Sequence, residues 1–250
     1  MLKSQRIQKI KEYVNAHQTV SLDKLMEEFQ VSKNTIRRDV QYLVQNEELK
    51  KVYGGVSTIH SELIPYNERA DKNQSKKQKI AELAATFIKN GDVIFLDSGT
   101  TTSELIPFIK DLDVTIVTNN ITIIVECLAY ENLTVFSTGG MLERKTNSFA
   151  GFKSLELLKS YNINKAFMAA TGISISNGVT NSSPSESSIK TTVVERSSEV
   201  FLLVDDSKFD RYALTTYCDL KTIPTIITNL EPNEQYMAYG KEHGVTFLYN

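Results

Sequence analysis

The spacing of apolar residues changes near residue 93, and this change constrains the fold more than any other feature of the sequence. Before it, apolar residues recur mainly at the three- and four-residue spacing of helices. After it, short apolar runs of strand length alternate with helical stretches. Such alternation is typical of a mostly parallel sheet with helices on both faces. The sequence therefore predicts an α/β chain with a helical N-terminal part and a larger C-terminal sheet domain.

Seven apolar runs are expected to form the strands of that sheet. The stretches between these runs are expected to form its helices. The runs lie at 93–96, 114–117, 133–136, 166–169, 200–204, 225–227 and 245–248. The helical stretches lie near 103–109, 121–128, 152–159, 186–197 and 233–242. A polar segment around Pro65 precedes a further helix that begins at Lys76. We therefore expect a small domain at 1–58, a linker at 59–75 and an α/β domain at 76–250.

Length and composition exclude several classes of protein. With 250 residues, 41% hydrophobic and 23% charged, the chain suits one large globular domain or two unequal ones. It has no apolar run of membrane-spanning length, no signal-peptide core at its start, and too few cysteines for a disulfide framework. We therefore expect a cytoplasmic protein without a membrane partner. Its histidines and cysteines show no ligand spacing, so we expect neither a metal nor a cofactor.

The N-terminal part predicts a helix-turn-helix followed by a β-ribbon. Apolar residues at helical spacing indicate three helices, and Ser21 and Ser32 are suited to cap the second and third. Only Gln30 and Val31 separate the second helix from the Ser32 cap, which is typical of a tight two-helix corner. Residues 49–59 are β-prone with a Gly-Gly bend, so they predict a wing.

The third predicted helix carries polar and basic residues opposite its apolar stripe. Arginine can bond a guanine edge, and Asn or Gln an adenine edge, while hydroxyl groups at a helix start suit phosphates. Residues 1–57 hold ten basic and seven acidic residues, a bias that favours a nucleic-acid-binding end. The candidate DNA contacts are Ser32, Lys33, Asn34, Thr35, Arg37, Arg38 and Gln41, with Lys50, Lys51 and Tyr53 in the wing. The alternative is a protein-interaction module whose polar face is merely solvated.

Small, hydroxyl-bearing or charged residues follow four of the predicted strands. Ligands of open α/β sheets bind beyond the carboxyl ends of the strands, so these residues predict a polar small-molecule site. The candidates are Asp97, Ser98, Gly99, Thr100, Thr101 and Thr102, then Thr118, Asn119 and Asn120, then Gly139 and Gly140, and finally Asp205 and Lys208.

The turn at 98–102 is suited to a phosphate group. Gly99 permits a close backbone approach, the hydroxyl groups add donors, and the helix that follows offers free N–H groups. Lys208 would supply a point charge. Three further side chains would bind sugar hydroxyls: Asp97, Asn119 and Asp205. The alternative interpretation of such a turn is simple helix capping.

Several ungapped phrases resemble the DeoR family of bacterial transcription regulators. In the N-terminal part they are Val31-Ser32-Lys33-Asn34-Thr35-Ile36-Arg37-Arg38-Asp39-Val40 and Tyr53-Gly54-Gly55-Val56. In the C-terminal part they are Lys79-Ile80-Ala81, Asp97-Ser98-Gly99-Thr100-Thr101, Val117-Thr118-Asn119, Gly139-Gly140, Gly151 and Asp205-Asp206-Ser207-Lys208-Phe209. Val40 stands where leucine is more usual. The resemblance implies a winged helix-turn-helix joined to a sensor domain similar in fold to ribose-5-phosphate isomerase and coenzyme A transferases.

The resemblance also implies a function. The chain would be a DNA-binding regulator, a repressor of a carbohydrate uptake or catabolism operon that a phosphorylated sugar releases from double-stranded operator DNA. It would act as a homo-oligomer, a dimer or a tetramer, because one recognition helix reads only a half-site. The sequence leaves repression and activation both open, and it does not identify the sugar.

One departure from the family pattern bears on the alternative, a sugar-phosphate isomerase with an accessory N-terminal domain. The family usually has Gly-Ala-Asp-Gly-Ile where this chain has Ala169-Ala170-Thr171-Gly172-Ile173. The isomerase-like enzymes need an acidic general base near this place, which Thr171 cannot be. We therefore expect no enzyme and assign no catalytic residue. Glu186 and Lys190, four positions apart, predict either a surface ion pair or a role near the pocket mouth.

Overall fold

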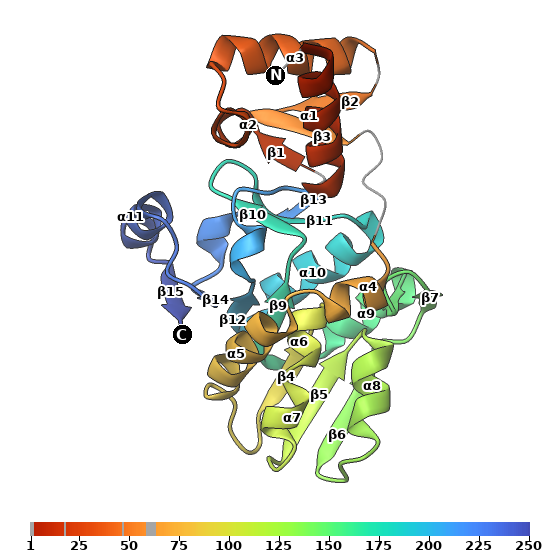
Figure 1. Cartoon of the computed structure of the whole chain (residues 1–250). Coiled ribbons are helices and arrows are strands. Elements are labelled where there is room, and N and C mark those ends of the chain that lie inside the picture. Colours follow the sequence, from red (N-terminus) through yellow and green to blue (C-terminus); the bar gives the residue numbers. More distant parts are fainter. Residues whose placement is uncertain (1–2, 18, 47, 59–63) are drawn as a thin grey trace.

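The computed structural model describes residues 3–17, 19–46, 48–58 and 64–250, which form an N-terminal module and a larger α/β domain (Figure 1). The module contains helices α1 (Lys3–His17), α2 (Leu22–Phe29) and α3 (Lys33–Gln45), and strands β1 (Thr19–Ser21), β2 (Leu49–Val52) and β3 (Gly55–Thr58). The strands pair antiparallel in the order β1-β3-β2. The predicted helix-turn-helix and ribbon are therefore confirmed, and β1 is an additional strand that the sequence did not predict.

Local chemistry fixes the corner between α2 and α3. Ser21 Oγ accepts a hydrogen bond from the Lys24 N–H at 3.1 Å, and Ser32 Oγ accepts one from the Thr35 N–H at 3.3 Å. Both serines thus satisfy an amide that a helix start leaves free. Gln30 ends α2 in the left-handed region with a φ of 49°. Apolar side chains from the helices and strands enclose one core: Ile10, Val14, Val20, Leu25, Ile36, Val40, Leu43, Leu49 and Val56.

Within the described residues of the α/β domain, seven strands form one parallel sheet in the order β15-β14-β12-β9-β4-β5-β6. Their bounds are β4 (Val93–Leu96), β5 (Val114–Thr118), β6 (Leu133–Ser137), β9 (Ile163–Ala169), β12 (Ser197–Leu203), β14 (Thr225–Thr228) and β15 (Thr246–Tyr249). Each predicted apolar run lies in or overlaps one of these strands, so the predicted α/β class is confirmed. From β4 the chain first adds β5 and β6 toward one edge of the sheet. It then returns to the other side of β4 and adds β9, β12, β14 and β15 toward the opposite edge. A topological switch point therefore lies between β4 and β9.

Shorter elements surround this sheet. The helices are α4 (Tyr66–Asp71), α5 (Gln74–Ala85), α6 (Thr100–Ser103), α7 (Ile106–Ile109), α8 (Ile121–Cys127), α9 (Phe152–Ser160), α10 (Pro184–Arg196) and α11 (Glu234–His243), with 3-10 turns η1 (Asp206–Lys208) and η2 (Leu220–Thr222). Two small antiparallel sheets, which the sequence did not predict, join β10 (Gly172–Ser174), β11 (Gly178–Asn181) and β13 (Thr215–Cys218), and β7 (Met141–Glu143) with β8 (Ser148–Ala150).

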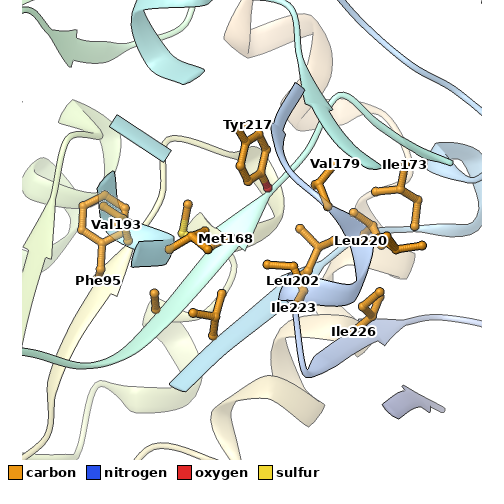
Figure 2. Close-up of a cluster of buried hydrophobic side chains, with 14 of the residues drawn as sticks. Phe95, Met168, Ile173, Val179, Val193, Leu202, Tyr217, Leu220, Ile223 and Ile226 are labelled. Atoms are coloured by element: carbon orange, nitrogen blue, oxygen red, sulfur yellow. The ribbon is translucent and has the colours of Figure 1, made fainter. Parts of the chain in front are cut away.

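Two cores lie on opposite faces of the parallel sheet, because successive strand residues point to opposite sides. In β4, Phe95 belongs to one core and Ile94 and Leu96 belong to the other. Helices α9 and α10 contribute to the first core, and α5 and α7 to the second. Figure 2 shows part of the first core, which includes Leu202 from the parallel sheet and Val179 from the small sheet. The small sheet thereby covers the sheet near its carboxyl end.

Residues 66–75, expected to be part of a linker, instead pack on the α/β domain. Tyr66 is buried, its hydroxyl lies 2.5 Å from Ser103 Oγ, and its N–H donates to the Lys145 carbonyl at 2.7 Å. Helix α4 buries only this one apolar residue, so its segment lacks the apolar periodicity that predicts a helix. Residues 59–63 of the expected linker lie outside the described residues.

Candidate functional site

Helix α3 lies along the edge of the N-terminal module that faces away from the α/β domain (Figure 1). Its inner face places Ile36, Val40 and Leu43 in the core. Its outer face carries the residues predicted to contact DNA: Ser32, Lys33, Asn34, Arg37, Arg38 and Gln41 are exposed, and Thr35 is half-buried. The helix surface is therefore open for insertion into a major groove.

The two arginines on this surface, Arg37 and Arg38, have no ion-pair partner within the described part of the chain. Lys33 differs, because its Nζ lies 3.0 Å from Asp23 Oδ1. Both members of that pair are exposed, and exposed pairs contribute little free energy, so a phosphate can compete for Lys33.

An aspartate within α3 is buried, which the sequence analysis did not anticipate. Asp39 is only 1% exposed, and Arg6 of α1 donates from Nε to its Oδ2 at 2.6 Å. The hydrogen bond to this carboxylate raises the pKa of the Arg6 guanidinium. The ion pair joins α1 to α3 behind the exposed arginines. The spacing of the sequence could have predicted that Asp39 is buried, because Asp39 follows Ile36 by three positions and lies on the same inward stripe.

The wing presents its predicted contacts in two places. Lys50 and Lys51 are exposed on β2. Tyr53, in the turn between β2 and β3, is 82% exposed, and its carbonyl oxygen accepts a hydrogen bond from Tyr212 Oη of the α/β domain at 3.5 Å. The turn thus lies at the junction between the two parts, apart from α3. This placement gives Tyr53 a neighbour that the sequence did not predict.

A cavity of about 140 Å³ lies beyond the carboxyl ends of β4, β9 and β12, at the topological switch point. We call it the anion cavity. Its wall includes five of the predicted ligand residues, namely Gly99, Thr100, Thr101, Asp205 and Lys208, together with Thr171. Its small volume, below the roughly 300–1,000 Å³ of sites for drug-sized molecules, suits a small metabolite.

The other predicted ligand residues do not appear in the described wall of the cavity: Asp97, Ser98, Thr102, Thr118, Asn119, Asn120, Gly139 and Gly140. Asp97, for example, is fully buried and accepts from the Ala169 N–H at 2.8 Å. Thr102 Oγ1 donates to the Asp97 carbonyl at 2.6 Å, and Asn120 caps α8. Strands β5 and β6 lie on the side of β4 away from β9, so residues 118–120 and 139–140 lie away from the switch point.

Gly99 is required by packing against a neighbouring strand. Its φ of −75° is ordinary for any residue. A Cβ at this position, however, would meet the Ala169 Cβ at 2.2 Å, which is a severe clash. The predicted reason for this glycine was close approach to a ligand, whereas the structure shows close approach to β9.

Basic side chains outnumber acidic ones in the described wall of the cavity. The basic residues are Arg69, Lys72, Lys77, Lys208 and Arg211, and the acidic ones are Glu68, Glu186 and Asp205. Burial lowers the pKa of Arg69, Arg211 and Lys208, and it lowers the pKa of Lys77 to about 8. At Lys208 the negative charge of Asp205 opposes this lowering of the pKa, whereas the positive charges of Arg69, Arg211 and Lys72 add to it. Positive charges that are partly removed from water and repel one another favour an anionic ligand.

Of these cations, only Lys208 was predicted from the sequence. Arg69 and Lys72 lie in the segment that was expected to be a linker, and Arg211 follows η1 without any recognisable motif. Lys77 does have a signal, because it precedes Ile80 by three positions on the buried stripe of α5. Its Nζ donates to the carbonyl oxygens of Arg69 and Ala70, which holds α4 against α5.

Lys190 lies beneath the cavity in a buried ion pair. The predicted pairing of Lys190 with Glu186 on the surface is wrong, because Lys190 is 2% exposed and its Nζ pairs with Asp97. The Lys190 ammonium also donates to the Ala169 carbonyl at 3.1 Å and lies 5.5 Å from the ring centre of Tyr217. These contacts tie α10 to the ends of β4 and β9, which form the floor of the cavity.

Glu186 is a buried acceptor in the cavity wall. Its Oε1 accepts from Ser148 Oγ at 2.6 Å, and its Oε2 accepts from Asn181 Nδ2 at 3.0 Å. Burial alone would raise the pKa of Glu186, but the charge of Lys190 and these hydrogen bonds outweigh burial and hold the pKa below its ordinary value. An ionised carboxylate in this position is suited to accept a hydrogen bond from a ligand hydroxyl.

Other chemistry-bearing groups indicate no second site among the described residues. These residues contain no cluster of three or more His, Cys, Asp or Glu side chains placed to bind a metal ion. None of their helices has the length and apolar character needed to cross a membrane. Burial raises the pKa of the Cys127 and Cys218 thiols to about 12, so both stay protonated and unreactive.

The chain is similar in sequence to known proteins along most of its length. The family model described as a DeoR-like helix-turn-helix domain matches residues 6–62, and that of the DeoR C terminal sensor domain matches residues 72–230. The HTH-type transcriptional regulator IolR of Bacillus subtilis (strain 168) is 42% identical, with 98% of each chain covered. The Glycerol-3-phosphate regulon repressor of Escherichia coli (strain K12) is 27% identical, again with 98% of each covered. A ribose 5-phosphate isomerase structure from Methanocaldococcus jannaschii matches 55% of each chain at 20% identity, with a TM-score of 0.40.

Proposed function

The chain belongs to the DeoR family of transcriptional regulators, and we propose how its two parts divide the regulation. The N-terminal module binds operator DNA, with α3 in the major groove and the wing lysines on the phosphate backbone. The α/β domain binds a phosphorylated sugar in the anion cavity, and the occupied cavity weakens DNA binding. The protein represses a carbohydrate operon as a dimer or a larger homo-oligomer.

The exposed face of α3 supports the proposed mode of DNA binding. Arg38 and Gln41 are exposed on the outer face of α3, where guanidinium and amide groups can bond base edges. Ser32 and the first amides of the helix suit a phosphate. One such helix reads only a few base pairs, so a specific operator requires two copies related by symmetry.

The basic side chains of the anion cavity carry the proposal of a phosphorylated ligand. A phosphate monoester has a charge of about −1.5 to −2 at pH 7 and three acceptor oxygens. Its binding would offset the repulsion around Lys208 and would replace the water that burial removes from Arg69 and Arg211. The hydroxyl groups of Thr100 and Thr101 line the cavity and have no hydrogen-bond partner within the described chain, so they can donate to the same phosphate. Glu186 and Asp205 are then the acceptors for sugar hydroxyls.

The names of two relatives support repression and a phosphorylated compound. The HTH-type transcriptional repressor GlcR of Bacillus subtilis (strain 168) is 28% identical, with 99% of this chain and 96% of that protein covered. The Glycerol-3-phosphate regulon repressor acts on a regulon named for a phosphorylated small molecule. Release from DNA then follows from linkage, since a ligand that prefers the state with weaker DNA affinity shifts the population toward it.

The alternative of a sugar-phosphate isomerase has less support. Thr171 lines the cavity where the isomerase-like pattern would require an acid, and a threonine hydroxyl is not a general base at neutral pH. The relatives with similarity along the full chain are transcriptional regulators. Incubating the full-length protein with ribose 5-phosphate and measuring the ketose tests this alternative, and measurable turnover would restore it.

Fluorescence anisotropy with labelled DNA from upstream of its own gene tests the regulator proposal. Sugar phosphates and their unphosphorylated counterparts are titrated into the protein–DNA complex. We expect at least one phosphorylated compound to weaken DNA binding tenfold or more, and the unphosphorylated form to have no effect. Lys208→Met should bind DNA normally and lose the response, whereas Lys241→Met, an exposed lysine on α11, should respond like the wild type. Equal responses to phosphorylated and unphosphorylated sugars would exclude the phosphate site.

A further inference from the structure

The wall of the anion cavity includes residues from both parts of the molecule. His17 ends α1 and Thr19 begins β1, and both line the cavity that contains Lys208 and Arg211. A second hollow of about 860 Å³ lies between the N-terminal module and the α/β domain, and it shares His17, Thr19 and Arg211 with the first. A ligand held by the cavity cations therefore lies next to the part of the chain that binds DNA.

The imidazole of His17 is positioned with one nitrogen available. Its Nδ1 lies 2.7 Å from the Tyr13 carbonyl oxygen, and because a carbonyl only accepts, Nδ1 carries the hydrogen. The His17 ring also stacks on the Tyr13 ring, with centroids 4.1 Å apart and planes 22° apart. Its Nε2 has no hydrogen-bond partner in the described part of the chain. The ring is thus held by α1, and its Nε2 is free to accept a hydrogen bond from a hydroxyl of the ligand.

A short segment after β12 connects the cavity to the wing. Ser207, Arg211 and Tyr212 line both hollows, and Tyr212 Oη donates to the Tyr53 carbonyl across the junction. Asp210, which directly precedes Arg211, has a φ of 55°. Tyr236 Oη donates a hydrogen bond to the Asp210 carboxylate at 2.9 Å. The same segment therefore carries two cavity cations and the contact with the wing.

We propose that a ligand in the anion cavity contacts the N-terminal module of its own subunit through His17, and that this contact couples the ligand to DNA binding. The inference rests on the proposed sugar-phosphate site. An anion held by Lys208 and Arg211 gains the contact with His17 only while the module is docked as in this structure, so the ligand stabilises the docked arrangement. Operator DNA holds the module through α3 and sets its spacing, which disfavours docking. The difference in ligand affinity between the two arrangements is the coupling free energy.

His17→Ala in the full-length protein tests this coupling, with His243→Ala as the matched control. His243 ends α11 as His17 ends α1, it lies beside a tyrosine ring at 4.3 Å between centroids, and it is exposed outside the described walls of both hollows. Inorganic phosphate is the probe. Calorimetry measures its binding, and anisotropy measures its effect on operator affinity.

We expect saturating phosphate to weaken operator binding tenfold or more in the wild type and in His243→Ala, and less than twofold in His17→Ala. His17→Ala should still bind phosphate, within about tenfold of the wild-type affinity, while Lys208→Met should not. A full phosphate effect in His17→Ala overturns the coupling and leaves the phosphate site intact. Phosphate that binds the wild type without changing operator affinity also overturns it. If phosphate binds the wild type no better than Lys208→Met, the proposed anion site itself fails, and the coupling fails with it.

Hydrogen exchange gives a second measurement that needs no DNA. With phosphate bound, amides of residues 10–17 and 19–26 should exchange more slowly in the wild type and in His243→Ala, because the module is held in its docked position. The slowing should be absent in His17→Ala. Protection confined to residues 99–101 and 205–211 in all three proteins would overturn the inference.

Discussion

The two cationic surfaces of this molecule differ in how far their charges are removed from water. Arg37 and Arg38 on α3 are exposed and, among the described residues, form no ion pairs. Three cations of the anion cavity, Arg69, Lys208 and Arg211, are partly buried, and burial lowers the pKa of each. Duplex DNA has one negative charge per roughly 1.7 Å, so many solvated contacts add up. A single phosphate has about two charges, so its site must strengthen each contact by excluding water.

A buried aspartate lies behind each surface, and the two differ in the same way. Asp39 pairs with Arg6, whose side chain is still 14% exposed, whereas Asp97 pairs with Lys190, whose side chain is 2% exposed. Removing either carboxylate leaves its cation without a partner. The free-energy cost of such a change therefore depends on whether the remaining cation can reach water.

The largest effect is expected from Asp97→Ala. This change leaves the Lys190 ammonium buried and unpaired, and it removes the acceptor of the Ala169 amide. Breaking a buried pair from one side costs about 3–5 kcal/mol. Urea unfolding of the full-length protein, followed by circular dichroism, should show a loss of this size in the free energy of unfolding.

The matched change in the N-terminal module is Asp39→Ala. We expect a smaller loss, about 1–3 kcal/mol, because the Arg6 guanidinium can turn toward solvent. Equal losses for both variants would break the comparison, because they would show that the exposure of the remaining cation does not matter.

Arg38→Ala should reduce operator discrimination. Loss of a bidentate contact with a base edge costs about 1–3 kcal/mol at that base position. Anisotropy with operators varied one base pair at a time should show one position at which the variant no longer discriminates. Lys9→Ala, which removes an exposed cation from α1, is the control and should keep the wild-type pattern. An Arg38→Ala protein with unchanged discrimination at every position would exclude this arginine from base contact.

Phosphate binding should weaken as the pH rises through about 8. Burial lowers the pKa of the Lys77 ammonium from 10.5 to about 8. This side chain therefore loses its charge in the folded protein at a pH where inorganic phosphate, with a second pKa of about 7, is mostly dianionic. The affinity should fall up to about tenfold between pH 7 and pH 9, by calorimetry. Lys77→Met should show a flatter profile. A wild-type profile that is flat up to pH 9 would mean that Lys77 does not act on the ligand.

The lowered pKa of Lys77 affects the stability of the ligand-free protein in the opposite direction. Between pH 8 and 10.5 the unfolded chain binds more protons at Lys77 than the folded chain, so this residue's contribution to the free energy of unfolding rises with pH. The phosphate affinity and the Lys77 contribution to stability are therefore expected to change in opposite directions over this range.

The smallest effect is expected from Lys51→Ala. Because the proposed contact of this exposed lysine is with a phosphate, its loss should weaken binding to all duplexes alike, by less than about 1 kcal/mol, and lower the salt slope by about 0.9. Lys110→Ala, an exposed lysine after α7, should change neither quantity. A loss at Lys51 that depends on the base sequence would show that the wing reads bases.

Much of the fold was predictable because its signals are local. The apolar runs marked the strands of the parallel sheet, and the caps at Ser21 and Ser32 marked the helix-turn-helix. The helix α4 was missed because it buries only Tyr66. The burial of Lys190 was missed because a lysine on a helix gives no local sign that it faces an aspartate 93 positions away.

Residues a few positions apart in the sequence decide which segments form helices and strands and which side of α3 is polar. Which strand ends meet depends instead on how distant segments pack. This packing places β9 beside β4, so residues 99–101 and Lys208 share a cavity, while β5 and β6 carry Asn119 and Gly139 away from it. It also brings Arg69 and Arg211 to the same cavity. The physical reason is that a charge cluster depends on packing between distant segments, whereas a hydrophobic period depends only on neighbours along the chain.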